Sequence, residues 1–234
     1  MSVILAFEAS ADACSVSLRL SPVEVNILKS DEPRAHAAHL LPFAQELLDQ
    51  AGRTINDIDY IACAIGPGSF TGLRIALSAA QGLAFSANKK IVPINSLSAL
   101  AFSAQAPDDC IVLPMMDARM AEVYWGAYSS QGVALNESLQ AVLGAEDSLF
   151  ADLQAISSPQ ALLPVGCAWK DIAFAQAAQG SLSMMPPLLT QVDAGHIAAL
   201  ADKQLPLGGL DPQLVDLCYC RNSIAWNKRT RIRS

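Results

Sequence analysis

Residues 65–75 read Ile-Gly-Pro-Gly-Ser-Phe-Thr-Gly-Leu-Arg-Ile. An apolar, strand-like stretch precedes this segment at 60–65, and a helix-like stretch follows at 71–87. Gly66 and Gly68, on either side of a proline, predict a rigid, sharply turned loop, and Thr71 is well placed to cap the helix. A strand, a glycine loop and a helix N-terminus in this order form either an anion site or a tight connection without a ligand.

The spacing of the loop excludes two common nucleotide motifs. The Walker pattern requires a Lys-Ser or Lys-Thr pair at its end, and none is present. The G-x-G-x-x-G pattern requires a third glycine at position 71, where this chain has threonine and places the glycine at 72.

The order of the predicted elements indicates the fold class. Three strand-like runs open the chain, at 3–9, 14–20 and 22–28, and a helix follows that begins or kinks near Leu40 because of Pro42. Beyond Gly52, the pattern alternates: strand 59–65, helix 71–87, strand 91–94 and a helix from Leu97. This is the order of a ribonuclease H-like unit, an α/β fold with a mixed sheet.

A weak internal repeat predicts a second copy of that unit. Strands are expected at 111–116, 121–128 and 133–139, with a turn at 117–120. Two ribonuclease H-like lobes make the actin and sugar-kinase architecture. We therefore expect an N-terminal lobe at 1–106, with partner-binding helices, and a C-terminal lobe at 107–234 with a basic tail. A last piece from Pro212 onward is a candidate to pack back across the lobes.

The composition limits the classes of protein to which this chain can belong. The chain has 234 residues, 52% of them hydrophobic and 16% charged, which is enough for a substantial core. No apolar run approaches the roughly 18 residues that a membrane span needs, and the first residues lack the basic region of a signal peptide. The six cysteines are scattered and suit core positions in a reducing compartment. We expect a cytoplasmic protein that does not contact membranes.

The charge distribution is asymmetric. The net charge of −7 makes the chain a poor candidate for binding nucleic acid alone, because phosphate backbones repel an acidic protein. Five basic residues nevertheless follow the last acidic one, Asp216. They form either a solvated tail or a contact with RNA or an acidic surface: Arg221, Lys228, Arg229, Arg231 and Arg233.

The glycine segment resembles the signature G-P-G-S-[FY]-T-G-[LI]-R of the TsaB/TsaD family of tRNA-modification proteins. Further segments that resemble this family lie along nearly the whole chain: 4–16, 34–42, Asp117-Ala118-Arg119, Tyr219-Cys220-Arg221 and Trp226. Within the family, the chain looks like the shorter members rather than the catalytic, TsaD-type ones.

The resemblance implies a cleft between the lobes whose nucleotide site is degraded. The first turn reads Glu8-Ala9-Ser10, where the family usually has Asp-Thr-Ser, and Arg119 stands where kinases keep a glycine. Arg119 either fills the phosphate space or forms an ordinary salt bridge that closes the lobes, with Glu8 and Asp117 as expected partners. The cleft residues are Glu8, Ser10, Gly66, Gly68, Asp117 and Arg119. ATP binding should be weak or absent, and we expect no cofactor.

No metal site or catalytic residue is expected. TsaD-type members hold their metal with two histidines at the places where this chain has Ser96 and Leu100, which are not usual metal ligands. His36 and His39 could share a helix face, but no third ligand follows them. His196 is isolated, and no serine has a histidine neighbour in sequence.

The two helices around 40–48 and 71–87 look apolar over more than a core-facing stripe requires, and a surplus apolar face marks an interface. The resemblance implies pairing with a TsaD-like transferase through these helices, self-association as a homodimer when alone, and a TsaE-like ATPase in the assembly. The candidates are His36, Leu40, Phe43, Leu47, Leu73, Ala76, Leu77 and Ala80. Arginine at Ala76 or Ala80 is predicted to break the complex without unfolding the chain.

These observations predict a non-catalytic scaffold that activates a TsaD-like transferase in N6-threonylcarbamoyladenosine modification of tRNA, and that meets tRNA only through the complex. The main alternative is an actin-fold, ATP-dependent small-molecule kinase or ATPase. A self-contained homodimeric regulator is a third possibility.

Overall fold

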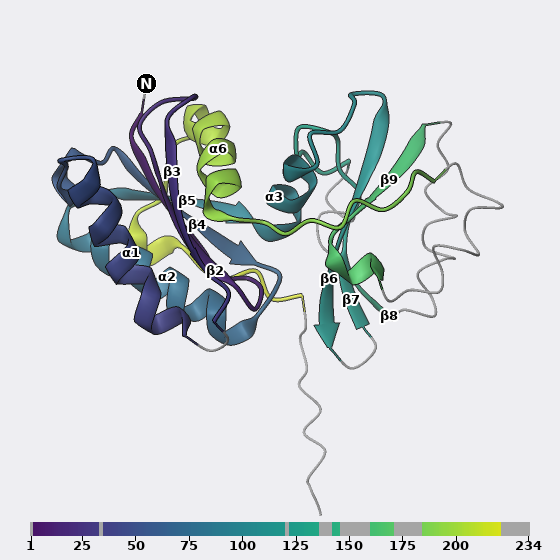
Figure 1. The fold of residues 1–234 in the computed structure, drawn as a ribbon, viewed down its shortest axis with the longest axis horizontal. Coiled ribbons are helices and arrows are strands. Elements are labelled where there is room, and N and C mark those ends of the chain that lie inside the picture. Colours follow the sequence, from purple (N-terminus) through teal and green to yellow (C-terminus); the bar gives the residue numbers. More distant parts are fainter. Residues whose placement is uncertain are drawn as a thin grey trace, which may run out of the picture.

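The computed structural model describes residues 2–32, 35–119, 122–135, 142–145, 160–170 and 184–220. These residues form two lobes, each built on its own mixed sheet (Figure 1). The first sheet has the order β3-β2-β1-β4-β5. Its strands are β1 (Ile4–Glu8), β2 (Cys14–Arg19), β3 (Val25–Ser30), β4 (Tyr60–Gly66) and β5 (Lys90–Asn95). β1, β2 and β3 form an antiparallel meander, whereas β4 pairs parallel with β1 and β5 parallel with β4.

Helices cover both faces of this first sheet. On β1, Leu5 and Phe7 belong to the core that includes α1 (His36–Gln50) and α2 (Phe70–Ser86). Ile4 and Ala6 belong to the opposite core, which includes α6 (Ala194–Gln204). Because both faces are covered, every residue of β1 is buried, which explains its continuous apolar sequence.

Both helices that pack on the first face begin differently from the sequence expectation. α1 begins at His36 rather than near Leu40, and Pro42 lies inside it. The imidazole of His36 is buried and donates a hydrogen bond of 2.8 Å to the carbonyl oxygen of Asp12, which ties the first turn of α1 to the β1–β2 turn. The N-cap of α2 is Ser69 rather than Thr71, because the Ser69 hydroxyl accepts a hydrogen bond from the Gly72 N–H.

The second lobe repeats the topology of the first. Its strands are β6 (Cys110–Arg119), β7 (Glu122–Trp125), β8 (Val142–Ala145) and β9 (Ala161–Val165), in the order β8-β7-β6-β9. β6, β7 and β8 are antiparallel and β9 is parallel to β6, as β4 is to β1. This duplication confirms the predicted pair of ribonuclease H-like lobes. The third strand lies at 142–145 instead of the expected 133–139, and residues 136–139 of the expected range lie outside the described residues.

α3 (Ser96–Ser103) lies between the lobes (Figure 1). Its apolar residues Leu97 and Leu100 are buried together with Val112 and Tyr128 of the second lobe, and the helix also contacts α6. The side chain of Asn95 caps the helix by accepting hydrogen bonds from the N–H groups of residues 97 and 98. α3 therefore joins the two cores.

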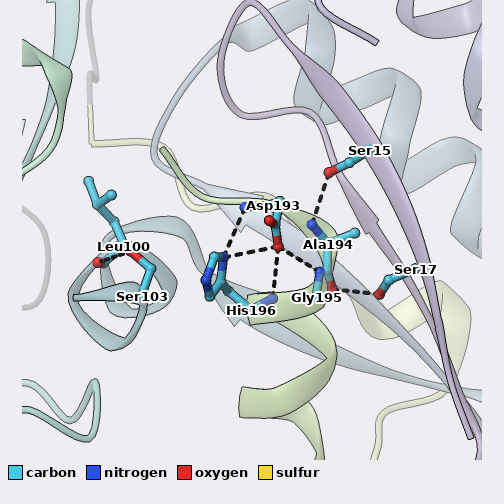
Figure 2. A network of polar contacts seen from close by, with 8 residues as sticks. All are labelled: Ser15, Ser17, Leu100, Ser103, Asp193, Ala194, Gly195 and His196. Carbon is cyan, nitrogen blue, oxygen red and sulfur yellow. Dashed lines mark hydrogen bonds and ion pairs between the residues drawn. The ribbon is translucent and has the colours of Figure 1, made fainter. Parts of the chain in front are cut away.

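The chain then returns to the first lobe. Ser15 and Ser17, both on β2, bond to the backbone of Ala194 at the start of α6 (Figure 2). Beyond α6, Leu210 forms an antiparallel bridge with Ile91 of β5. Short 3-10 helices complete the described structure: η1 (Ile55–Asp57), η3 (Cys167–Lys170), η4 (Leu205–Leu207) and η5 (Pro212–Leu214).

This return differs from the expected division of the chain at 106/107. That division assigns the whole of 107–234 to the second lobe, whereas α6 contacts all five strands of the first sheet. The physical reason is that the second face of the first sheet needs an apolar cover. α6 supplies it with buried Ile197, Ala198 and Ala201.

Candidate functional site

The glycine loop packs against the β1–β2 turn. A Cβ atom on Gly68, whose φ is +152°, would lie 2.4 Å from the carbonyl oxygen of Ser10. A Cβ on Gly72 would lie 2.1 Å from the carbonyl oxygen of Ala9. The Ser69 N–H donates a hydrogen bond of 2.7 Å to the Ser10 carbonyl. The glycines therefore allow two backbones to approach closely, which favours a tight connection over an anion site.

The side chain of Glu8 is directed to its own turn. It is 2% exposed, and its Oε1 accepts hydrogen bonds from the N–H of Ser10, at 2.6 Å, and from the Ser10 hydroxyl. Oε2 has no partner among the described residues. Burial raises the pKa of Glu8 to about 7, against the opposing effect of the two bonds from Ser10, with smaller contributions from Asp193 and His196.

Arg119 bridges the lobes at their surface. Its φ of +65° is in the left-handed region. One guanidinium nitrogen lies 2.9 Å from Asp117 Oδ2, and the other lies 3.5 Å from Asp12 Oδ1, in the β1–β2 turn of the first lobe. The partners are thus Asp117 and Asp12, and no contact of Arg119 with Glu8 is found among the described residues. Because all three side chains are more than half exposed, these ion pairs contribute little stability.

The six cleft residues therefore do not converge on one point. Gly68 contacts the turn that contains Ser10, and the nearest atom to a Cβ on Gly66 would be the Cys218 carbonyl oxygen, at 3.0 Å. The guanidinium of Arg119 forms ion pairs with two of the chain's own carboxylates and does not face an open phosphate-binding position. This arrangement is better suited to holding the two lobes together than to binding a phosphate group.

The residues expected to bind a partner lie mostly inside the first lobe. Ala76 and Ala80 are 0% exposed and pack between α2 and the sheet. Of the eight candidates, Phe43 alone is partly exposed. The other seven are buried: His36, Leu40, Leu47, Leu73, Ala76, Leu77 and Ala80. Sequence spacing identified the apolar stripe on each helix, but that stripe faces the chain's own sheet.

The outer face of the two helices carries a different set of residues. On α1, Leu41 and Pro42 are exposed. On α2, the exposed and partly exposed residues include a small or aliphatic set, Ile75, Ser78, Ala79, Gly82 and Leu83, and also Phe70, Arg74 and Phe85. Between the helices lies a groove of about 390 Å³, lined by Leu41, Ala44, Gln45, Leu48, Asp49, Arg53, Thr54, Ile55 and Leu83.

Gly82 is the most informative residue on that outer face. It lies in the interior of α2, where glycine costs roughly 1 kcal/mol relative to alanine. A Cβ at this position would meet nothing within 4 Å, so the folded chain itself does not require glycine there. A site of close approach by a second helix would require it. The sequence signal was the run of small residues on α2, which does not indicate which of them point outward.

Metal-binding clusters are absent from the part of the chain that the structure describes. His36 bonds to the Asp12 carbonyl, His39 pairs with Glu32, and His196 pairs with Asp193 at the N-terminus of α6 (Figure 2). Each imidazole therefore has a structural partner. None of the helices in the described ranges combines the length and apolar character needed to cross a bilayer.

Comparison with known proteins identifies the family. A family model described as "TsaD: tRNA N6-adenosine threonylcarbamoyltransferase" matches residues 29–184. The tRNA threonylcarbamoyladenosine biosynthesis protein TsaB of Escherichia coli is 31% identical, over 96% of this chain and 97% of that protein. The protein of the same name from Haemophilus influenzae is 30% identical, over 96% of each chain.

Solved structures agree with this relationship. YeaZ from Pseudomonas aeruginosa is 29% identical and superposes with a TM-score of 0.75, covering 94% of this chain and all of that one. A second Pseudomonas aeruginosa structure, described as similar to peptidase YeaZ, is 30% identical with a TM-score of 0.78 and the same coverage. The matching sequence, the duplicated lobes and the near-complete coverage lead to one conclusion: this chain belongs to the TsaB family of tRNA threonylcarbamoyladenosine biosynthesis proteins.

Proposed function

We propose that this chain is a non-catalytic scaffold that activates a TsaD-like transferase in the N6-threonylcarbamoyladenosine modification of tRNA. Its relatives of similar length are named as biosynthesis proteins of this nucleoside. The observation that carries the non-catalytic role is the state of the inter-lobe cleft. The β1–β2 turn packs closely against the glycine loop of the cleft. Arg119, the cation of the cleft, forms ion pairs with the chain's own carboxylates.

The partner surface that we propose is the outer face of α1 and α2. It replaces the buried set expected from the sequence and comprises Leu41, Ile75, Ser78, Ala79, Gly82 and Leu83. Small residues at Ser78, Ala79 and Gly82 let a second helix approach closely, and the adjacent groove can receive its larger side chains. In the absence of the transferase, a second copy of this chain would occupy the same face as a homodimer. A TsaE-like ATPase would join the assembled complex.

The geometry disfavours the kinase alternative. A kinase needs an open phosphate site. In this chain, the corresponding turns hold Glu8, a buried carboxyl group with a raised pKa, and Arg119, which forms an ion pair with the chain's own Asp117. Isothermal titration with Mg-ATP distinguishes the two functions. We expect no micromolar binding, and micromolar binding that Asp117→Ala abolishes would restore the kinase alternative.

Reconstitution tests the proposal. Purified TsaD-like and TsaE-like partners, threonylcarbamoyl-AMP synthase, ATP, threonine, bicarbonate and unmodified tRNA are combined with or without this chain. We expect modified nucleoside only when the chain is present, and none from the chain with tRNA and substrates alone. Full modification in its absence would overturn the scaffold role, and modification by the chain alone would overturn the non-catalytic role.

A further inference from the structure

Two cysteines face each other on the segment that returns to the first lobe after α6. Cys218 and Cys220 are both partly exposed, and the thiol of Cys220 donates a hydrogen bond to the sulfur of Cys218. Only one residue separates them, so their Cα atoms are at most roughly 7 Å apart. Disulfides usually join cysteines whose Cα atoms are about 4.4–6.8 Å apart. The two thiols are therefore placed to form a disulfide with little movement of the backbone.

Contacts with the first lobe hold this pair in place. The Cys218 N–H donates a hydrogen bond of 2.8 Å to the carbonyl oxygen of Ile65, in β4. The Cys218 carbonyl oxygen lies where it would be 3.0 Å from a Cβ on Gly66. Tyr219, between the two cysteines, accepts a hydrogen bond of 3.2 Å from the Nε of Arg74 on α2. The two thiols are thus carried by a fixed segment and remain neighbours in the folded chain.

The pair also lies close to the second lobe. Tyr128 is buried and its backbone bridges to Val112 of β6. Burial raises the pKa of Tyr128, and the charges of the two cysteines raise this pKa further. The Tyr128 hydroxyl donates a hydrogen bond of 3.3 Å to the side-chain oxygen of Asn95. The two thiols therefore lie where the returning segment meets both lobes.

The hydrogen bond between the thiols makes them chemically unequal. It lowers the pKa of Cys218 to about 7, although partial burial has the opposite effect. The same bond is the main cause that raises the pKa of Cys220, and burial is a second cause. The thiolate, and not the thiol, is the nucleophilic form of cysteine. An accessible thiolate beside a second thiol is the arrangement typical of cysteines that react reversibly with oxidants.

The other four cysteines differ from this pair. Cys14, Cys63 and Cys110 are buried, and burial raises the pKa of each thiol. Cys167 is exposed, and its thiol donates a hydrogen bond of 3.6 Å to the Thr190 carbonyl oxygen. Groups of three or more metal-ligating side chains are not found in the described ranges, so the pair lacks the further ligands of a structural zinc site there.

We propose that Cys218 and Cys220 form a reversible disulfide site for peroxides. The Cys218 thiolate attacks one oxygen of hydrogen peroxide, so that an S–O bond forms, the O–O bond breaks and hydroxide leaves. The Cys220 sulfur then attacks the sulfur of the Cys218 sulfenic acid. The S–S bond forms, the S–O bond breaks, and the hydroxyl group leaves as water with the proton of Cys220. The two sulfurs lose two electrons in all, and the peroxide takes them up.

The second step is favoured by the first. The negative charge on Cys218 contributes to the raised pKa of Cys220, and this charge is gone once the sulfenic acid has formed. A dithiol reductant reverses the whole reaction by thiol–disulfide exchange. In a reducing compartment, the pair is therefore expected to be reduced at rest and oxidised only when peroxide rises. This inference is independent of the proposed function, because neither a partner nor tRNA takes part in it.

The test exposes the reduced chain to a small molar excess of hydrogen peroxide and then alkylates the remaining thiols. Mass spectrometry follows the tryptic peptide 204–221, which contains both cysteines of the pair and no other. We expect a peptide that has lost two hydrogens and takes up no alkyl group, and that dithiothreitol returns to the dithiol. Cys167, on a different peptide, is the control and should still be alkylated.

Three substitutions test the roles of the two sulfurs. In Cys220→Ser, oxidation should stop at a sulfenic acid on Cys218, which dimedone traps. Cys218→Ser should leave Cys220 reduced under the same exposure. Cys220→Ala also removes the hydrogen bond that a serine hydroxyl can keep. Alkylation of Cys218 at pH 7 should therefore be about threefold or more slower in Cys220→Ala than in Cys220→Ser. Circular dichroism checks that each variant is folded.

The wild-type chain alone can overturn the proposal. Alkylation of both Cys218 and Cys220, at a peroxide concentration that already oxidises Cys167, would exclude a peroxide-reactive pair. A disulfide between two copies of the chain, in place of one within the peptide, would exclude the intramolecular step. Equal alkylation rates of Cys218 in the serine and alanine variants would contradict the role of the hydrogen bond. None of these outcomes affects the scaffold role, which is measured by tRNA modification.

Discussion

The side-chain hydroxyl of Ser15, on β2, accepts a hydrogen bond of 2.9 Å from the backbone N–H of Ala194, a residue 179 positions later in the chain (Figure 2). Ala194 is the first residue of α6, and both residues are buried. The N–H groups in the first turn of a helix have no partner within the helix. Ser15 supplies one for this buried helix end and so docks the returning helix on the first sheet.

Ser15→Ala should therefore lower the free energy of unfolding by about 1–3 kcal/mol, because it leaves a buried N–H without an acceptor. Urea denaturation followed by circular dichroism measures the change. Ser86→Ala, at an exposed serine near the end of α2, is the control and should change stability by less than about 0.5 kcal/mol. Equal effects of the two substitutions would contradict the docking role of Ser15.

The pH dependence of stability should report the burial of Glu8. Burial raises the pKa of Glu8 from 4.5 to about 7, so the folded state holds the proton more tightly than the unfolded chain. Between these two values unfolding releases a proton, and the free energy of unfolding falls as the pH rises, by about 3 kcal/mol in all. The contribution is fully present below pH 4.5 and is lost as the pH rises through 7.

Glu8→Gln removes this titration. The free energy of unfolding of this variant should therefore depend less on pH between 4.5 and 8, whether the variant is more or less stable than wild type at any one pH. Denaturation midpoints at a series of pH values measure the slope. Asp216→Asn, at an exposed carboxylate, should leave the wild-type slope unchanged. A parallel loss of stability in wild type and Glu8→Gln over this range would show that Glu8 titrates normally.

Gly82→Ala should stabilise the isolated chain. The position is helical, and a Cβ there meets nothing within 4 Å. Alanine should therefore raise the free energy of unfolding by about 0.5–1 kcal/mol. Thermal unfolding of the two proteins tests this expectation. A decrease in melting temperature would mean that Gly82 has a role inside the folded chain, and it would weaken the argument for a partner at this position.

Gly82→Arg should abolish association with the TsaD-like partner without unfolding the chain, because the added side chain points outward from α2. Ala80→Arg, by contrast, should unfold the chain, since Ala80 is 0% exposed and arginine would place a charge in the core. This corrects the expectation that arginine at Ala76 or Ala80 would spare the fold. Val23→Arg, at an exposed residue in the β2–β3 turn, is the control for association.

Size-exclusion chromatography with the purified transferase measures this association. Complex formation by a folded Gly82→Arg variant would exclude the outer face of α2 as the interface.

The elements that the sequence predicted well are those set by neighbouring residues. The strand, loop and helix from 60 to 86 follow from an apolar run, closely spaced glycines and a helical spacing of leucines, and their observed bounds differ from expectation by one residue. Pro42 predicted that this helix begins or kinks near Leu40, and α1 begins earlier, at His36, where a tertiary hydrogen bond to the Asp12 carbonyl holds its first turn. No local pattern indicates that bond.

The two-lobe α/β fold and the family could be predicted from the amino-acid sequence, because the order of apolar runs, the helical periodicity and the glycine segment can be read along the chain. The residues of α2 that are exposed could not be predicted in this way. Ala76, Ala80 and Gly82 are all small and differ little in hydrophobicity, so no periodicity separates them. Their exposure depends on the side of the helix where the sheet lies, and long-range packing decides that side.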